Sequence, residues 1–319
     1  AGPIERATHL LPQFTVKRKF DYELAVDGMR LILWGFFKKL VVADTSAVLV
    51  NQIFGTYEQQ SGAVLVLGAV FFSFQIYGDF SGYSDIAIGT ARLFGIRLMR
   101  NFNLPYFARD IAEFWRGWHI SLTTWFRDYV YIPLGGSRLG RWITLRNTLI
   151  VFLVSGFWHG ANWTFIAWGV YHALLFIPLM LFNINRRHLD IGHSIRADST
   201  LRSNLLRLIT FVLVAIGWVF FRSATVTDAF AYLGTMLSFS SGYFDLSTLF
   251  TGATTLSRYT VLFAPVSIGI LLLAEWFQSG KEHPLVLAHS PYRRLVYFLL
   301  IVFIYIAKGG SASFIYFQF

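Results

Sequence analysis

The sequence contains no cysteine, which excludes disulfide bonds, thiolate nucleophiles and cysteine metal sites. Charged residues are also scarce, at 14% of the chain, whereas soluble domains carry about 25%. The P-loop, the dinucleotide fingerprint, HExxH and GxSxG are all missing. These absences argue against common nucleotide-binding, zinc-peptidase and serine-hydrolase classes, and we expect no metal site and no bound cofactor.

Hydrophobic residues are abundant instead. They make up 55% of the 319 residues, the mean hydropathy is +0.54, and 18% of the chain is aromatic. A membrane-spanning helix needs roughly 20 apolar residues. Six segments approach this length, some with flanking residues: Ser61–Gly78, Thr148–Phe157, Thr164–Phe182, Leu205–Phe221, Tyr259–Ala274 and Leu295–Ala307. The composition therefore predicts an all-α integral membrane protein with several spans.

Two further segments are expected to be helical without being simple spans. Leu24–Phe54 is long and apolar, but its charges recur on one side, which predicts an amphipathic or deeply packed helix. Arg97–Arg146 is rich in Trp, Tyr and Arg and is interrupted by prolines and glycines. Broken backbone at membrane depth is tolerated where it is buried in protein or lines a cavity. We therefore predict short re-entrant or interfacial helices there, in a multi-helix bundle around a central polar tunnel.

The net charge of +10 does not indicate a nucleic-acid partner. The basic residues fall mostly between the apolar segments, as in Lys17–Lys19, Arg186–Arg187 and Arg293–Arg294. Such juxtamembrane clusters are typical of loops retained beside a lipid bilayer. We expect the bilayer, and not DNA or RNA, to be the partner of these charges.

His159 is the first candidate for chemistry. It lies in FWHGANW, inside a stretch without Asp, Glu, Lys or Arg from Asn147 to Asn185. An ionisable residue in a membrane segment is a functional hypothesis by default, although a structural histidine bonded to a neighbouring helix is the alternative. Asn162 lies three residues on and, on a helix, would share roughly the same face. Trp158, directly before the histidine, is a candidate neighbour in the tunnel.

His119 is the second candidate. It lies in EFWRGWHISLTTWF, with Arg116 three residues before it and tryptophans on both sides. An interfacial helix with an aromatic belt is the alternative interpretation. His172 follows His159 by thirteen residues, so on a helix it would point largely the other way, and we interpret it as a packing or hydrogen-bonding residue.

Asp79 and Asp85 lie in YGDFSGYSDIAIG, inside an otherwise apolar segment. Six residues separate them, so they cannot share a face of one regular helix, and the glycines suggest a break. Buried carboxylates could orient a histidine, carry protons or pair with arginines such as Arg92. His193 and Asp198 spell an H-x-x-x-x-D motif, but in a charged loop that makes an accidental match the better interpretation.

Two long stretches resemble a known family. GDFSGYSDIAIGTARLFGIRLMRNFNLPYFARDIAEFWRGWHISLTTWFRDYVYIPLGG and SGFWHGANWTFIAWGVYHALL resemble the membrane-bound O-acyltransferases, more narrowly the branch that acetylates alginate and other bacterial exopolysaccharides. AGPIERATHLLPQF, KKLVVAD and the ending FIYFQF are similar to that branch too, so the resemblance covers essentially the whole chain. Members of the branch carry more amino-terminal spans. We therefore expect residues 1–319 to be a single membrane-embedded domain, the carboxy-terminal part of a longer chain.

The resemblance implies a function and roles for the two histidines. His159 matches the catalytic histidine of the family and His119 its second polar residue in the active site. Acetyl-CoA would be the donor, a polysaccharide the acceptor, and a periplasmic or extracellular acetyltransferase the partner, with the protein in the bacterial inner membrane. Histidine can act as the base for acyl transfer because its unperturbed pKa is about 6.5.

Two alternatives stay open at the level of sequence. A proton-coupled transporter could use His159, Asp79 and Asp85 as a relay. Transporters often contain inverted repeats with paired broken helices, and no internal repeat is visible here. Transfer of D-alanine to teichoic acid is the second alternative, and the wording of FWHGANW and FIYFQF favours polysaccharide acetylation over it.

Overall fold

The computed structural model describes residues 2–189, 195, 199–239, 241–249, 255–278, 280–286 and 290–307. Within these ranges the chain is helical and contains no strand, as the composition predicted. The principal helices are α1 (Ala7–Thr15), α2 (Tyr22–Phe36), α3 (Asp44–Gly55), α4 (Gly62–Leu93), α5 (Ile111–Gly117), α6 (Ile120–Phe126), α7 (Arg141–His159), α8 (Trp163–Leu181), α9 (Leu201–Arg222), α10 (Val226–Leu237), α11 (Thr255–Gln278) and α12 (Ser290–Ala307). Short π- or 3-10-helical pieces are η1 (Phe37–Ala43), η2 (Tyr57–Gln59), η3 (Pro105–Phe107), η4 (Arg127–Tyr131), η5 (Ser247–Leu249) and η6 (Pro284–Val286).

Four helices in the described ranges are long and apolar enough to cross a membrane. They are Gly62–Leu93, Trp163–Leu181, Leu201–Arg222 and Thr260–Gln278. Each contains one of the predicted apolar segments to within one residue at its ends. The other two predicted segments, Thr148–Phe157 and Leu295–Ala307, lie in α7 and α12, which are not among these four helices of the described ranges.

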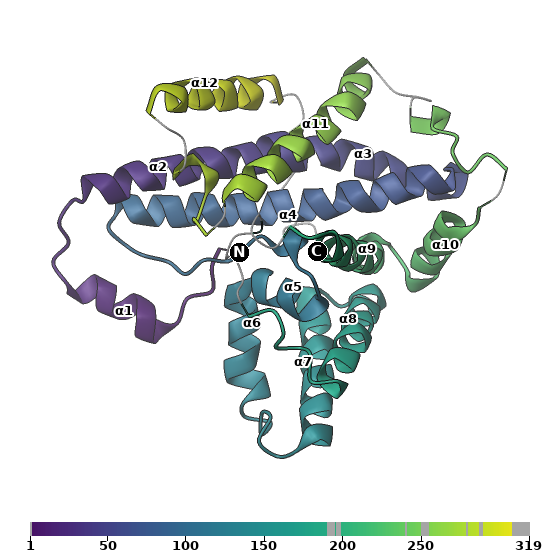
Figure 1. Cartoon of the computed structure of the whole chain (residues 1–319), viewed down its shortest axis with the longest axis horizontal. Coiled ribbons are helices and arrows are strands. Elements are labelled where there is room, and N and C mark those ends of the chain that lie inside the picture. The colour runs from purple at the N-terminus through teal and green to yellow at the C-terminus, as the bar shows by residue number, and fades with distance from the viewer. Residues whose placement is uncertain are drawn as a thin grey trace.

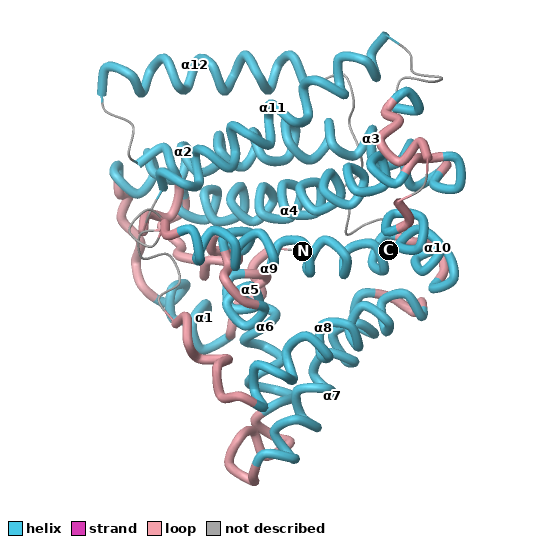
Figure 2. Tube along the Cα trace, turned by 45° about the vertical axis from the view of Figure 1, so that its right-hand side comes forward, coloured by secondary structure: helices cyan, strands magenta, loops and turns pink. Residues whose placement is uncertain are grey.

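A long helical hairpin forms one side of the molecule. The segment α2–η1–α3 runs as one unbroken helical rod and packs antiparallel along α4 (Figure 1). Val41 and Val42 of η1 and Phe72 of α4 are all fully buried. Leu24–Phe54 is thus a deeply packed helix and not a simple span, as predicted. Helix α12 lies on the other side of this rod from α4 (Figure 2). Helix α11 crosses the rod obliquely, and the Tyr77 hydroxyl of α4 donates to Glu275 near the end of α11.

Glycines, and not a break, explain the sequence of α4. The prediction of a break in Tyr77–Gly89 was wrong, because α4 is continuous from Gly62 to Leu93. A Cβ at Gly82 would lie 2.7 Å from the carbonyl oxygen of Gly35, and one at Gly89 would lie 2.5 Å from that of Gly28. The glycines therefore let α2 and α4 touch through their backbones.

The segment Arg97–Arg146 forms short helices, as predicted. It contains η3, α5, α6 and η4, none longer than 7 residues, and then the start of α7. Together α6 and η4 form the first arm of a second hairpin, a turn follows at Ile132–Gly140, and α7 forms the returning arm (Figure 1). This smaller hairpin positions the candidate site.

Candidate functional site

The smaller hairpin brings His119 and His159 to the same end of one cavity. His119 is the residue before α6, at the start of the first arm, and His159 is the last residue of α7, at the end of the second. The forty residues from one histidine to the other form the hairpin, so its closure brings the two together. Both line a cavity of about 450 Å³, which we call the hairpin cavity.

The hairpin cavity extends along one face of α7. Its lining residues on that helix recur at helical spacing: Thr144, Thr148, Val151, Phe152, Ser155 and His159. Since an α-helix rises about 1.5 Å per residue, this face is about 22 Å long. Residues of α5, α6, η4 and α8 complete the wall. The cavity is therefore long and narrow, with the two histidines at one end.

His159 sits where α7 stops. Gly160 has φ +158°, and a Cβ there would lie 2.6 Å from the ring of Phe165, so a glycine at this position allows the close turn into α8. The His159 imidazole is surrounded by aromatic rings, with its centroid 5.3 Å from that of Trp168 and 5.0 Å from that of Phe221. The aromatic surroundings restrict which orientations the imidazole can adopt.

His119 is held in a strained backbone conformation. Its φ of 44° and ψ of 54° lie in the left-handed region, which costs a residue with a side chain about 1–2 kcal/mol. The amide of Ile120 donates to the carbonyl oxygen of Asn101 at 2.9 Å and holds this geometry. The His119 side chain is buried, packed edge-on to Phe80 of α4 at 4.5 Å between centroids. Strain of this kind concentrates at functional sites.

Trp158 contacts both histidines. Its indole centroid lies 6.1 Å from the His119 imidazole and 4.9 Å from that of His159. The side chain is nearly half exposed, at 47%. Trp158 therefore packs beside the two histidines but is not among the residues that line the hairpin cavity.

Arginines line the other part of the hairpin cavity. Arg116, Arg127 and Arg186 are among its lining residues, and the described residues that line it include no Asp or Glu. Arg127 and Arg186 are exposed, and Arg186 lies in the loop that follows α8. Asp128 accepts from Nε of Arg127 at 2.8 Å and so neutralises part of this charge. Guanidinium groups favour an anionic ligand, above all a phosphate.

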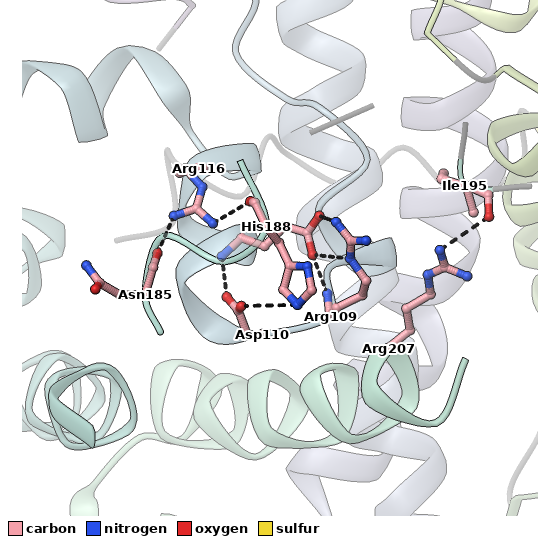
Figure 3. A network of polar contacts seen from close by, with 8 residues as sticks. Arg109, Asp110, Arg116, Asn185, His188, Ile195 and Arg207 are labelled. Atoms are coloured by element: carbon pink, nitrogen blue, oxygen red, sulfur yellow. Dashed lines mark hydrogen bonds and ion pairs between the residues drawn. The ribbon is translucent and has the colours of Figure 1, made fainter. Parts of the chain in front are cut away.

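Arg116 also clamps the loop that carries Arg186 (Figure 3). Its guanidinium donates from Nη1 to the carbonyl oxygen of Asn185 at 2.9 Å and from Nη2 to that of His188 at 2.7 Å. His188 Nε2 is 3.9 Å from Asp110. Burial lowers the pKa of His188, and the nearby Arg109 guanidinium lowers it further, so this contact is not a strong ion pair at neutral pH. The Arg116 bonds therefore hold the loop against the cavity.

Asp79 and Asp85 do not reach the hairpin cavity. Both belong to the seam between α4 and the opposite rod, where Asp85 pairs with Lys38 and Asp79 pairs with Lys39 at 2.6 Å. Lys39 also contacts Asp44 at 2.7 Å. The partners are lysines and not the arginines considered from sequence. Both carboxylates therefore form ion pairs that join α4 to the rod, which is a structural role.

Asn162 is a helix cap and does not share a helix face with His159, so that prediction was wrong. The helix ends between the two residues, and Asn162 is the N-cap of α8, with its side-chain oxygen accepting from the Thr164 amide at 3.1 Å. Its Nδ2 donates to the carbonyl oxygen of Ala224 at 3.0 Å. It lines a different, largely apolar pocket beside α8 and α10.

His172 has the first of its two predicted roles, packing, since neither of its ring nitrogens has a hydrogen-bond partner within the described residues. It is fully buried, with its ring 5.1 Å from Trp168 and 5.0 Å from Trp115, measured between centroids. The motif His193–Asp198 lies outside the described residues, as does the ending FIYFQF.

Two residues of the site have no signal in the sequence. Asn101 lies in a loop without a recognisable motif, yet its side chain bonds to His119 and Ser121. Arg186 was interpreted only as part of a juxtamembrane basic cluster. Only the folded loop places it at the cavity.

The chemistry available in the cavity is that of imidazole and guanidinium groups. Over the part of the chain that the structure describes, no group of three or more His, Asp or Glu side chains is arranged to hold a metal ion. Imidazoles can accept and return protons, and guanidinium groups can bind phosphates. The arrangement is suited to transfer of a group carried on a phosphate-bearing molecule.

Comparison with known proteins identifies the family. The model of the membrane-bound O-acyltransferase family matches residues 2–221, more than half of the chain. The chain belongs to the membrane-bound O-acyltransferase family. Both histidines and the whole smaller hairpin fall inside the matched part.

The names of the curated relatives of this O-acyltransferase refer to different polymers. A probable alginate O-acetylase from Pseudomonas aeruginosa is 41% identical over 249 residues, which is 78% of this chain and 45% of the relative. A peptidoglycan O-acetyltransferase from Helicobacter pylori is 39% identical over 240 residues, covering 74% of this chain and 44% of the relative. A teichoic acid D-alanyltransferase from Streptococcus thermophilus is 31% identical over 187 residues, covering 54% and 45%. The chain spans about half the length of the curated relatives it matches.

Proposed function

We propose that the protein is a membrane O-acetyltransferase that moves acetyl groups from acetyl-CoA toward an exported polysaccharide, with His159 as the general base. One observation carries the proposal: a long cavity has two histidines at one end and is lined elsewhere by three arginines. The family supports acyl transfer, and the named relatives support a polymeric acceptor.

The cavity suits a long donor with phosphates at one end and a thioester at the other. The exposed guanidinium groups of Arg127 and Arg186 would bind the phosphates of CoA, and Arg116 would hold the loop that carries Arg186. The pantetheine arm would then lie along the face of α7 that lines the cavity, which is about 22 Å long and offers both apolar and hydroxyl side chains. The thioester would come to the histidines, where the reaction takes place.

The reaction needs one proton acceptor. The acceptor hydroxyl attacks the thioester carbon, and the His159 imidazole takes its proton. The tetrahedral intermediate collapses, the carbon–sulfur bond breaks, and the proton returns to the leaving thiolate. The products are an O-acetyl ester and free CoA.

The acetyl group is favoured over D-alanine as cargo. The O-acetylating relatives are 38–41% identical over 74–89% of the chain, whereas the D-alanyltransferases are 31% identical over 54–55%. A proton relay through Asp79 and Asp85 lacks support, since neither carboxylate is among the residues that line the cavity with His159.

Location and partner follow from the donor. CoA thioesters are cytosolic and the polymer is exported, so we place the protein in the bacterial inner membrane, with the four candidate spans crossing the bilayer. A periplasmic or extracellular partner acetyltransferase, which the resemblance to the exopolysaccharide branch implies, would complete the transfer to the polysaccharide.

The test is His159→Ala in the full-length protein, in cells that also contain the partner. Loss of the base should lower acetyl incorporation by a factor on the order of 10² to 10⁴. His159→Gln can keep a hydrogen bond but cannot take a proton at neutral pH, so it should be nearly inactive too. Incorporation is measured per amount of membrane-inserted protein, and supply of labelled acetyl-CoA to inverted vesicles identifies the donor.

Asp198→Ala is the control, because Asp198 belongs to the motif interpreted as accidental. It should transfer acetyl at the wild-type rate. Wild-type incorporation by His159→Ala would overturn the catalytic assignment.

A further inference from the structure

Asn101 lies at the centre of a buried hydrogen-bond network beside the cavity. Its side chain is fully buried. Its Oδ1 accepts from the Ser121 hydroxyl at 2.9 Å and from the Ser121 amide at 3.3 Å, and it lies 3.1 Å from Nδ1 of His119. Its Nδ2 donates to the hydroxyl of Ser84, on α4, at 3.0 Å. Every polar atom of this amide therefore has a partner.

This network determines which nitrogen of His119 carries the proton. A backbone amide can only donate, so the Asn101 atom that faces the Ser121 amide must be the carbonyl oxygen. The same oxygen faces Nδ1 of His119, and two acceptors would repel each other, so Nδ1 carries a hydrogen. A neutral imidazole has one N–H, which leaves Nε2 with a free lone pair.

The free nitrogen belongs to a residue of the cavity wall. His119 lines the hairpin cavity, and within the described residues Nε2 makes no hydrogen bond. The backbone of Asn101 contributes as well, because its carbonyl oxygen accepts from the Ile120 amide and holds His119 in its left-handed conformation. One residue thus controls both the place and the tautomer of this imidazole.

We propose that Asn101 is a positioning residue that holds His119 as the Nδ1–H tautomer, so that Nε2 accepts a hydrogen bond from an O–H or N–H of the substrate. This inference rests on the proposed function, since it assumes that the substrate enters the hairpin cavity. It separates the two histidines by role: His159 moves the proton, and neutral His119 orients the substrate. Transfer then requires that His119 is not protonated.

The experiment is the pH profile of acetyl transfer by membranes that contain the full-length protein, its partner and labelled acetyl-CoA. In Asn101→Asp the carboxylate keeps the bond to Nδ1 and favours the imidazolium form. Its rate at alkaline pH should stay within a few-fold of wild type, and its acid limb should move upward by about one pH unit. Asn101→Leu removes the bond and should lower the rate at every pH by roughly 10- to 100-fold, by analogy with residues that orient ligating histidines.

Ser121→Ala is the matched control. It removes one hydrogen bond to the same Oδ1 and the long 3.5 Å contact of the Ser121 hydroxyl with Nδ1 of His119, but it leaves the Ser121 amide and the 3.1 Å contact between Asn101 and His119 in place. Its acid limb should therefore lie where that of the wild type does. An unmoved acid limb in Asn101→Asp, or a wild-type rate in Asn101→Leu, would overturn the positioning role. If His159→Ala is inactive while the Asn101→Asp profile is unmoved, only the positioning role fails. If His159→Ala is fully active, the proposed function itself fails.

Discussion

The substitution Gly82→Ala tests whether the backbone contact between α2 and α4 supports the fold. A Cβ at this position would lie 2.7 Å from the carbonyl oxygen of Gly35 and 3.0 Å from the amide nitrogen of Lys39. Both atoms belong to backbone, which cannot move aside as a flexible side chain can. The two helices would have to separate, and the ion pairs of Lys38 and Lys39 with α4 would stretch with them.

The expected loss can be worked out from this geometry. Normal contact between heavy atoms needs about 3.5 Å, so the helices must move apart by roughly 0.5–1 Å, which forfeits a quarter to a half of the local dispersion energy. Overpacking of a core typically costs about 1–3 kcal/mol. Alanine recovers about 1 kcal/mol through its better helix propensity. The variant should therefore lose up to about 2 kcal/mol of stability.

Gly234→Ala is the matched control, because nothing lies within 4 Å of a Cβ at Gly234 in α10. Because its Cβ meets no other atom, the Gly234→Ala variant should be more stable by about 0.5–1 kcal/mol through the higher helix propensity of alanine. The assay is the apparent thermal midpoint of the detergent-solubilised protein at one fixed scan rate, since unfolding of such proteins is commonly irreversible. The midpoint should fall for Gly82→Ala and rise for Gly234→Ala. Equal shifts of the same sign would refute the proposed packing role.

Two further predictions concern buried charge and helix capping. Lys39→Met leaves Asp44 and Asp79 without the ammonium group that both contact, so it should destabilise the protein by about 3–5 kcal/mol. Adding Asp79→Asn should recover part of that loss in the same thermal assay, and no recovery would contradict the ion-pair account. Asn162→Ala removes the cap of α8 and should cost about 0.5–2 kcal/mol. Acetyl transfer per folded molecule should be unchanged in Asn162→Ala. Asn162→Asp should restore only part of the midpoint, because its carboxylate can cap α8 but cannot donate to the Ala224 carbonyl as the amide does. A selective loss of transfer would return Asn162 to the site.

The sequence alone determined the class of the protein and its two leading site residues. Scarce charge and long apolar segments predict membrane helices whatever their packing, because hydropathy is a local property. Prolines and glycines between Arg97 and Arg146 predicted short helices, and these were confirmed. His159 and His119 were singled out because burying an ionisable side chain in an apolar segment costs free energy, so such residues are commonly functional.

Only the tertiary structure decided how these parts meet. A glycine in a sequence is compatible both with a broken helix and with close packing of two helices. The structure shows close packing at Gly82 and Gly89, because carbonyl groups of α2 lie against both positions. The role of Asn101 could not be predicted from the sequence either, because the role of an asparagine in a loop depends on which groups its side chain bonds to. Its bond to His119 and the arrival of Arg186 at the cavity depend on segments far apart in the chain. Local sequence preference carries no information about such contacts, since they arise only when the hairpin closes and the loop after α8 folds against it.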